Sequence, residues 1–205
     1  MTTRRLVTAL LLVVVAACSG GESSDDDSPS TEAESEATDE PAAAIPGCDN
    51  VAAATFPRRS PRGASQVAFL EAVDAAEEGC FDVLHLEFAE PGVGAGLPPG
   101  YVVEYRDGPF VTGEGEATEE IDVAGSAFLV VTLESASRTF APPDAEPQQT
   151  YGGPTDITPG LNHIEEVVLI VDDLDRMEWV IGLDEERPFA VDAAAAPPRV
   201  SVKIA

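Results

Sequence analysis

Apolar and polar residues alternate along much of the chain after residue 80, which is the pattern of β-strands. In residues 82–88, Leu84, Leu86 and Phe88 fall on one face and His85 falls on the other. Further apolar stretches with alternation, or with many β-branched and aromatic residues, lie at 101–105, 127–133, 164–171, 177–183, 188–191 and 199–204. Loops rich in Gly, Pro or acidic residues separate them, at 91–100, 108–120 and 141–159. Short strands with such connections predict an all-β fold, an antiparallel β-sandwich or barrel-like domain of about seven or eight short strands.

Residues 65–79 fit two structures. Val67, Leu70, Val73 and Ala76 recur with helical spacing, and Gly79 is suited to end a helix. The local pattern favours a helix, whereas the family resemblance described below favours a strand.

The amino terminus has the pattern of an export signal. Two arginines precede the apolar run Leu6–Ala16, which is too short to span a bilayer, and the tetrad Val15-Ala16-Ala17-Cys18 follows. This tetrad resembles the lipobox of bacterial lipoproteins, which implies cleavage after residue 17 and diacylation of Cys18. We therefore expect residues 1–17 to be a signal peptide and the mature protein to be lipid-anchored on the extracytoplasmic face of the cell membrane.

The segment that follows is acidic and contains few apolar residues. We expect residues 18–47 to be the lipidated cysteine and a disordered tether, and residues 48–205 to be one domain. The chain carries a net charge of −27 and a single lysine, Lys203. Such a charge repels phosphate backbones and excludes nucleic acid as a partner.

Two further cysteines, Cys48 and Cys80, remain in an oxidising compartment, where an even number suggests a disulfide. A metal pair or a nucleophile is the alternative reading. Neither cysteine belongs to a CxxC motif, and the chain offers only His85 and His163 as imidazole ligands, so no zinc site is expected.

Motifs of catalysis are missing. The sequence contains no GxSxG, SxxK, HExxH, Walker or GxGxxG pattern, so we expect a protein that is not an enzyme and needs no cofactor. Acidic pairs are abundant enough that a carboxylate-dependent glycan hydrolase remains a minor alternative. Asp172, Asp173 and Asp175 could bind calcium, but a solvated hairpin turn between two strands is the preferred interpretation.

Four aromatic residues are candidates for stacking on sugar rings: Tyr101, Tyr105, Tyr151 and Trp179. Trp179 shares its strand face with Met177 and Ile181, so we expect it in the core. Tyr101 and Tyr105 share a strand face with Val103, so core packing is the alternative for both. Tyr101 and Tyr151 are the candidate ligand contacts, and that role requires each to lie at the surface.

The order of several landmarks resembles the AMIN-like domain of actinobacterial envelope lipoproteins, which is related to the AMIN domain. The resemblance covers most of residues 65–205, and its landmarks include residues 81–88, 99–105, 123–125, 151–154, 179–183 and 197–200. It implies an all-β, non-catalytic domain that targets peptidoglycan or other wall glycan. A lipoprotein that assembles with another envelope protein, without glycan binding, is the alternative. Val83 and the acidic run Asp74–Glu78 replace positive charge usual in the family, which argues against an anionic ligand.

Overall fold

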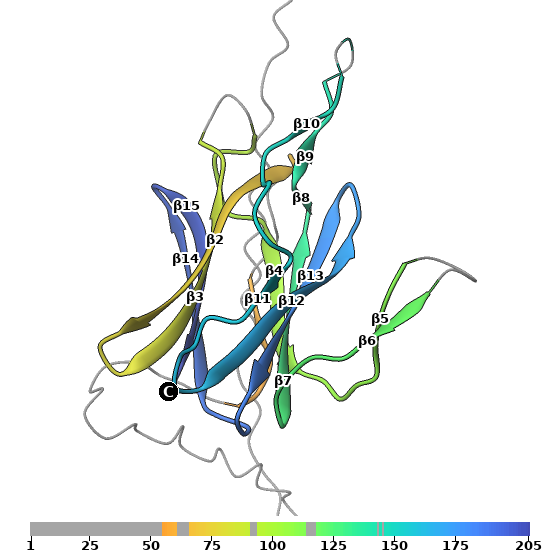
Figure 1. Ribbon diagram of the computed structural model, residues 1–205. Coiled ribbons are helices and arrows are strands. Elements are labelled where there is room, and N and C mark those ends of the chain that lie inside the picture. Colours follow the sequence, from red (N-terminus) through yellow and green to blue (C-terminus); the bar gives the residue numbers. More distant parts are fainter. Residues whose placement is uncertain (1–54, 61–65, 91–93, 114–117, 143, 145) are drawn as a thin grey trace, which may run out of the picture. The chain divides into compact units, whose positions relative to one another are not determined.

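The described part of the chain is an all-β domain built from two packed sheets (Figure 1). The computed structural model describes residues 55–60, 66–90, 94–113, 118–142, 144 and 146–205. All regular elements in these ranges are strands, and almost all pairings are antiparallel. The predicted all-β sandwich is therefore confirmed.

The first sheet has six strands, every neighbouring pair of which is antiparallel. In spatial order they are β1 (Arg58–Arg59), β4 (Gly100–Tyr105), β7 (Ala127–Glu134), β13 (Arg176–Leu183), β12 (Ile164–Asp172) and β11 (Asp156–Ile157).

The second sheet has five strands, and only the pairing of its last two is parallel. In spatial order they are β14 (Phe189–Ala195), β15 (Pro198–Ile204), β3 (Phe81–Phe88), β2 (Ala68–Glu78) and β8 (Ala136–Ser137). Two small two-stranded sheets complete the set: β5 (Phe110–Thr112) with β6 (Glu119–Ile121), and β9 (Thr139–Phe140) with β10 (Gln148–Gln149).

The core lies between the two large sheets because alternate residues of each strand point inward. Trp179 and Phe189 are fully buried there, together with branched aliphatic side chains of both sheets. The expectation that Trp179 belongs to the core is confirmed. Six predicted strands also fall within elements of the structure, and the seventh, residues 188–191, begins one residue early.

A β-bulge explains why residues 65–79 resemble a helix in the sequence. They contain strand β2, and its register against β3 shifts between Leu70 and Ala72. The extra residue places Leu70 and Val73 on the same core-facing side although they are three positions apart. The local prediction of a helix is wrong for this reason, and the strand implied by the family resemblance is correct.

One residue carries the chain from the first sheet to the second. Ser135 separates β7 from β8 and has φ of 56°, a left-handed conformation that is uncommon for a residue with a side chain. The Ala136 N–H donates to the carbonyl of Asp175, and the Ala68 N–H donates to the carbonyl of Ser135. The corner is therefore bonded to β2 of the second sheet and to the turn that precedes β13 of the first.

The predicted loop at 108–120 is partly wrong, because its described residues include the hairpin strands β5 and β6. Phe110 packs edge-on to Phe128, with ring centroids 5.3 Å apart, on the outer face of the six-stranded sheet. The other buried members of this second apolar cluster are Val123, Val130, Val168, Ile170 and Val180. These buried apolar contacts stabilise a hairpin that the acidic sequence alone does not predict.

In the described residues no helix is long and apolar enough to cross a membrane.

Candidate ligand-binding site

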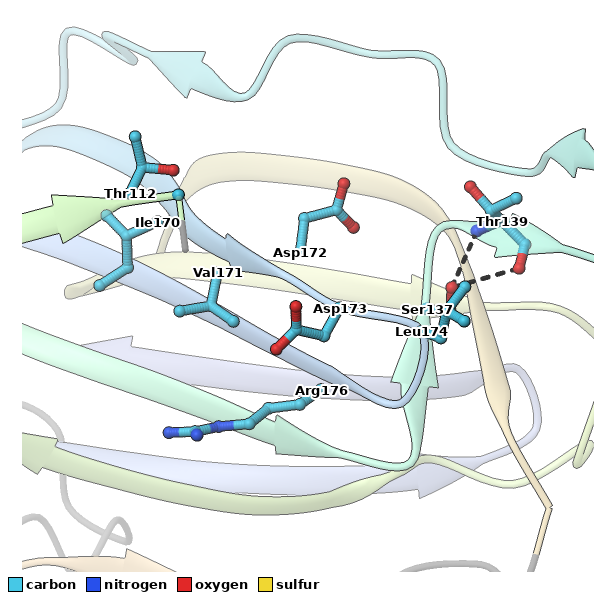
Figure 2. Close-up of a pocket in the computed structure, with 10 residues that line it drawn as sticks. Thr112, Ser137, Thr139, Ile170, Val171, Asp172, Asp173, Leu174 and Arg176 are labelled. Carbon is cyan, nitrogen blue, oxygen red and sulfur yellow. Dashed lines mark hydrogen bonds between the residues drawn. The ribbon is translucent and has the colours of Figure 1, made fainter. Parts of the chain in front are cut away.

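A cavity of about 570 Å³ opens where the β5–β6 hairpin meets the end of the β12–β13 hairpin. Figure 2 shows Thr112 at one end, Ser137 and Thr139 at the other, and the side chains of Asp172 and Asp173 between them. The remaining lining residues are Gly113, Ile170, Val171, Leu174 and Arg176. We call this the hairpin cavity.

Each wall of the hairpin cavity is held in place by buried structure. The β5–β6 hairpin is seated by Phe110 and Val123, both buried in the second apolar cluster. On the opposite wall, Ser137 is buried, and its hydroxyl donates to the Thr139 carbonyl and accepts from the Thr139 N–H. Buried contacts therefore anchor residues on both walls.

The turn between β12 and β13 forms the floor. The Asp173 N–H donates to the Arg176 carbonyl at 2.9 Å, which closes the hairpin, and Arg138 forms an ion pair with Asp172. The predicted hairpin turn is confirmed. In the described residues, no group of three or more His, Cys, Asp or Glu side chains is arranged to hold a metal ion.

The lining suits a polyhydroxylated ligand. Hydroxyls of Thr112 and Thr139 can both donate and accept hydrogen bonds, and the Asp173 carboxylate accepts them. Leu174 is 75% exposed and offers an apolar surface to the CH face of a ring. The volume lies within the usual range for small-molecule clefts, about 300–1,000 Å³.

A buried carboxylate, Glu178, lies next to this cavity and was not identified from the sequence. Arg176 and Thr132 donate hydrogen bonds to its Oε1, and Arg106 forms an ion pair with it at 3.3 Å. Burial opposes ionisation of Glu178, but these hydrogen bonds and the arginine charges outweigh it, so its pKa is lowered. Arg176 is thus held by Glu178 on the outer face of the six-stranded sheet.

The two candidate tyrosines differ in burial. Tyr101 on β4 is half-buried, and its backbone is paired with Ser60 through two hydrogen bonds. Tyr151 is only 4% exposed, packs edge-on to Trp179, and donates its hydroxyl hydrogen to the Pro154 carbonyl at 2.6 Å. The expectation that Tyr151 lies at the surface is wrong, because the loop that follows β10 folds its ring onto the core. Neither tyrosine lines the hairpin cavity.

A Ser–His–Glu chain crosses three strands of the five-stranded sheet. Ser201 Oγ and His85 Nδ1 are 2.9 Å apart, as are His85 Nε2 and Glu78 Oε1. The hydrogen bond from His85 lowers the pKa of Glu78. Ser201 is 5% exposed and His85 7%, so the serine hydroxyl is not presented to a substrate. We interpret the chain as a polar contact that runs from the buried Ser201 and His85 to the exposed Glu78 and joins β15, β3 and β2.

The other end of the sandwich carries a compact ion cluster. Asp184 pairs with the Arg187 guanidinium, which lowers the pKa of Asp184 to about 2. The Arg187 N–H donates to the Tyr105 hydroxyl oxygen, which in turn donates to the Arg187 carbonyl. This cluster ties the segment before β14 to β4.

The predicted cysteine roles fall largely outside the described residues. Cys18 and Cys48 are outside the described residues. Cys80 is within them, in the exposed turn between β2 and β3, and it is disulfide-bonded. The anchor and the pairing with Cys48 stay predictions.

Comparison with known protein families identifies the domain. The sequence pattern of the AMIN-like domain matches residues 68–205, which is more than half of the chain and includes both walls of the hairpin cavity. No curated protein and no solved structure gives a significant match.

Proposed function

Because the chain belongs to the AMIN-like domain family, we propose that it is a membrane-anchored, extracytoplasmic lipoprotein whose domain binds cell-wall glycan without catalysis. AMIN-like domains are generally non-catalytic binding domains related to the cell wall. The family match is the observation that carries the proposal. The net charge of −27 and the departures at residues 74–83 favour a neutral part of the wall polymer, the sugar backbone, over its anionic groups.

Lipidation of Cys18 would place the domain where it meets the wall. Two acyl chains bury enough CH₂ groups, at about 0.8 kcal/mol each, to hold a protein at a bilayer without a membrane-spanning helix. The test is fractionation of cells that express Cys18→Ala. We expect release into the medium or an uncleaved leader, and unchanged membrane retention of a processed protein would contradict the anchor.

We further propose that Cys48 is the disulfide partner of Cys80. If Cys18 carries lipid, Cys48 is the one other cysteine in the sequence, and Cys80 is disulfide-bonded. A loop of this length contributes roughly 3–4 kcal/mol in the chain-entropy model. Peptide mapping of the unreduced protein should recover one linked fragment that contains both residues, and full labelling of both thiols in the denatured, unreduced protein would refute the pairing.

The hairpin cavity is our candidate for the glycan site. Its lining combines hydroxyls, two aspartate carboxylates and an exposed leucine, which can hydrogen-bond sugar hydroxyls and contact a ring CH face. The half-buried Tyr101 is a separate candidate, because it lies on β4 and not in this cavity.

The deciding experiment is co-sedimentation of the detergent-solubilised full chain with purified sacculi. Asp173→Ala and Leu174→Ala should each reduce the bound fraction several-fold. Leu97→Ala is the matched control, because Leu97 is another exposed leucine that lies outside the cavity. It should bind like the wild type.

The outcomes separate the alternatives. Wild-type protein that stays in the supernatant would end the glycan proposal and favour assembly with an envelope protein. Release of soluble muropeptides during the incubation would instead indicate a hydrolase. Equal loss of binding in Leu97→Ala would show that the cavity is not the site.

A further inference from the structure

The two large sheets have four outer strands, and these differ greatly in length. Among the described residues, β1, β11 and β8 have two residues each, whereas β14 has seven. Short outer strands are one way in which proteins avoid unwanted pairing with another chain. In the described part of the chain, β14 pairs only with β15, so one long edge is left open.

The pairing with β15 fixes which backbone groups of β14 are unpaired. The Ala205 N–H donates to the Pro188 carbonyl, so residues 188 and 205 form a hydrogen-bonded position of the ladder. Hydrogen-bonded positions alternate along an antiparallel pair. The backbone N–H and C=O groups of Ala190, Asp192 and Ala194 therefore point towards β15. The N–H and C=O groups of Val191, Ala193 and Ala195 therefore point away from the sheet.

The side chains do little to protect this edge. Residues 193–195 are alanines, and no proline interrupts β14. Its one charged residue, Asp192, forms an ion pair with Lys203 of β15, which neutralises it. The edge therefore lacks the lysine, proline or bulge that usually prevents edge-to-edge contact.

From this geometry we propose that β14 is a self-association edge, where two copies of the chain pair antiparallel about a two-fold axis at Ala193. Val191 then lies opposite the partner's Ala195, and Ala193 lies opposite the partner's Ala193. In this register the outward N–H and C=O groups of Val191, Ala193 and Ala195 find partners, and the two five-stranded sheets become one sheet of ten strands.

The charges of the chain permit this register. Asp192 lies opposite the partner's Ala194, so the two aspartates do not face each other. The acidic residues 184–186 precede the strand and lie beyond the partner's β14–β15 turn. The high negative charge of each copy still repels the other at long range, so the dimer becomes more stable as salt increases.

Cysteine cross-linking of the full chain in its own membrane tests the register. In Ala193→Cys the two Cα atoms would lie about 5.5 Å apart, within disulfide range. In the matched control Ala194→Cys the equivalent distance is about 7–8 Å, beyond it. After mild oxidation we expect at least about tenfold more reducible dimer from Ala193→Cys than from Ala194→Cys or wild type. Equal cross-linking of the two variants, or none from either, would overturn the proposal.

A second experiment does not depend on the introduced thiol. Ala193→Pro removes only an outward-facing N–H, so the ladder with β15 and the melting temperature should be preserved. Sedimentation velocity of the detergent-solubilised full chain should show a dimer for wild type that dissociates in Ala193→Pro. A wild-type monomer at all salt concentrations, or a dimer that survives in a folded Ala193→Pro variant, would refute the proposed edge.

Discussion

Gly182 on β13 faces the backbone carbonyl of Ala124 so closely that a side-chain carbon on Gly182 would overlap the carbonyl oxygen. The Ala124 N–H donates to the Glu166 carboxylate at 2.6 Å, and the Ser126 N–H donates to the Leu183 carbonyl at 2.7 Å. The segment before β7 is therefore fixed against β13 through backbone contacts that leave no room for a side chain. Residues 123–125 and 179–183, two of the landmarks of the family resemblance, are therefore in direct contact in the fold.

Gly182→Ala should be strongly destabilising. The obstructing atom belongs to the backbone of Ala124, so the overlap is relieved only by moving β13 or by breaking the hydrogen bonds that hold the segment before β7, and we expect a loss of roughly 2–5 kcal/mol. Urea unfolding of the purified protein measures it. Gly152→Ala is the control, because a Cβ there meets no atom within 4 Å. Equal stability of Gly182→Ala and wild type would contradict this account.

Glu178→Gln should weaken the outer face of the six-stranded sheet. The change leaves two arginines without their shared carboxylate, and hydrogen bonds to charged groups contribute about 1.5–3 kcal/mol each. Because both arginines are partly exposed, we expect the lower end of that range. Thr132→Val, which removes a single neutral donor to Glu178, should cost less. The reverse order in thermal or urea unfolding would disprove the role assigned to the carboxylate.

The free energy of unfolding should fall at acidic pH as the Asp184–Arg187 ion pair is lost. The ion pair lowers the pKa of Asp184 from 3.8 to about 2, so its contribution to stability is complete above about pH 4 and is lost as the pH falls towards 2. Asp184→Asn should therefore lose less stability than wild type between pH 5 and pH 2. Solvent screens the partly exposed pair, so the difference is modest.

Urea unfolding at several pH values measures this difference. Asp107→Asn, at an exposed position, should follow the wild-type curve. An Asp184→Asn curve parallel to that of wild type would show that the pair does not stabilise the fold.

Substitutions of Trp179 and Tyr151 should lower the stability of the fold, whereas substitution of Tyr101 should leave it intact. Trp179→Ala leaves a cavity in the core and should cost about 3–5 kcal/mol. Tyr151→Phe removes only the hydrogen bond to the Pro154 carbonyl and should cost about 1 kcal/mol. Tyr101→Ala should keep the fold, and if Tyr101 contacts glycan it should also weaken sacculus binding. Thermal melts beside the co-sedimentation assay separate the cases, and Tyr101→Ala with unchanged binding would remove Tyr101 as a contact.

The fold could be predicted from the sequence where strands are long and alternate. The buried faces of β3 and β15 follow directly from the two-residue period, and Met177, Trp179 and Ile181 identify the core face of β13. Strand β2 could not be identified locally, because one inserted residue interrupts its two-residue period between Leu70 and Val73. The β5–β6 hairpin was also missed, since its stability comes from residues far away in the chain, such as Val168 and Val180.

The candidate site was harder to predict, because its residues come from separate hairpins. Asp172 and Asp173 were recognised as a turn, but nothing in the sequence places Thr112 or Thr139 beside them. Glu178 falls at an outward position of a regular strand and so suggests an ordinary surface residue. The available signal is the spacing of opposite charges: Arg176 and Glu178 lie two residues apart and so share one face of the strand. Arg106 joins this pair only in three dimensions.

The corner at Ser135 has a consequence for how the domain opens. Strands β7 and β8 are one nearly continuous run of backbone, so hydrogen bonds of both sheets depend on the same few residues. Separation of β8 from β2 therefore displaces the end of β7, which lies inside the other sheet between β4 and β13. For this reason the two layers should open together, and their slowest amide protons should exchange with solvent at one common rate.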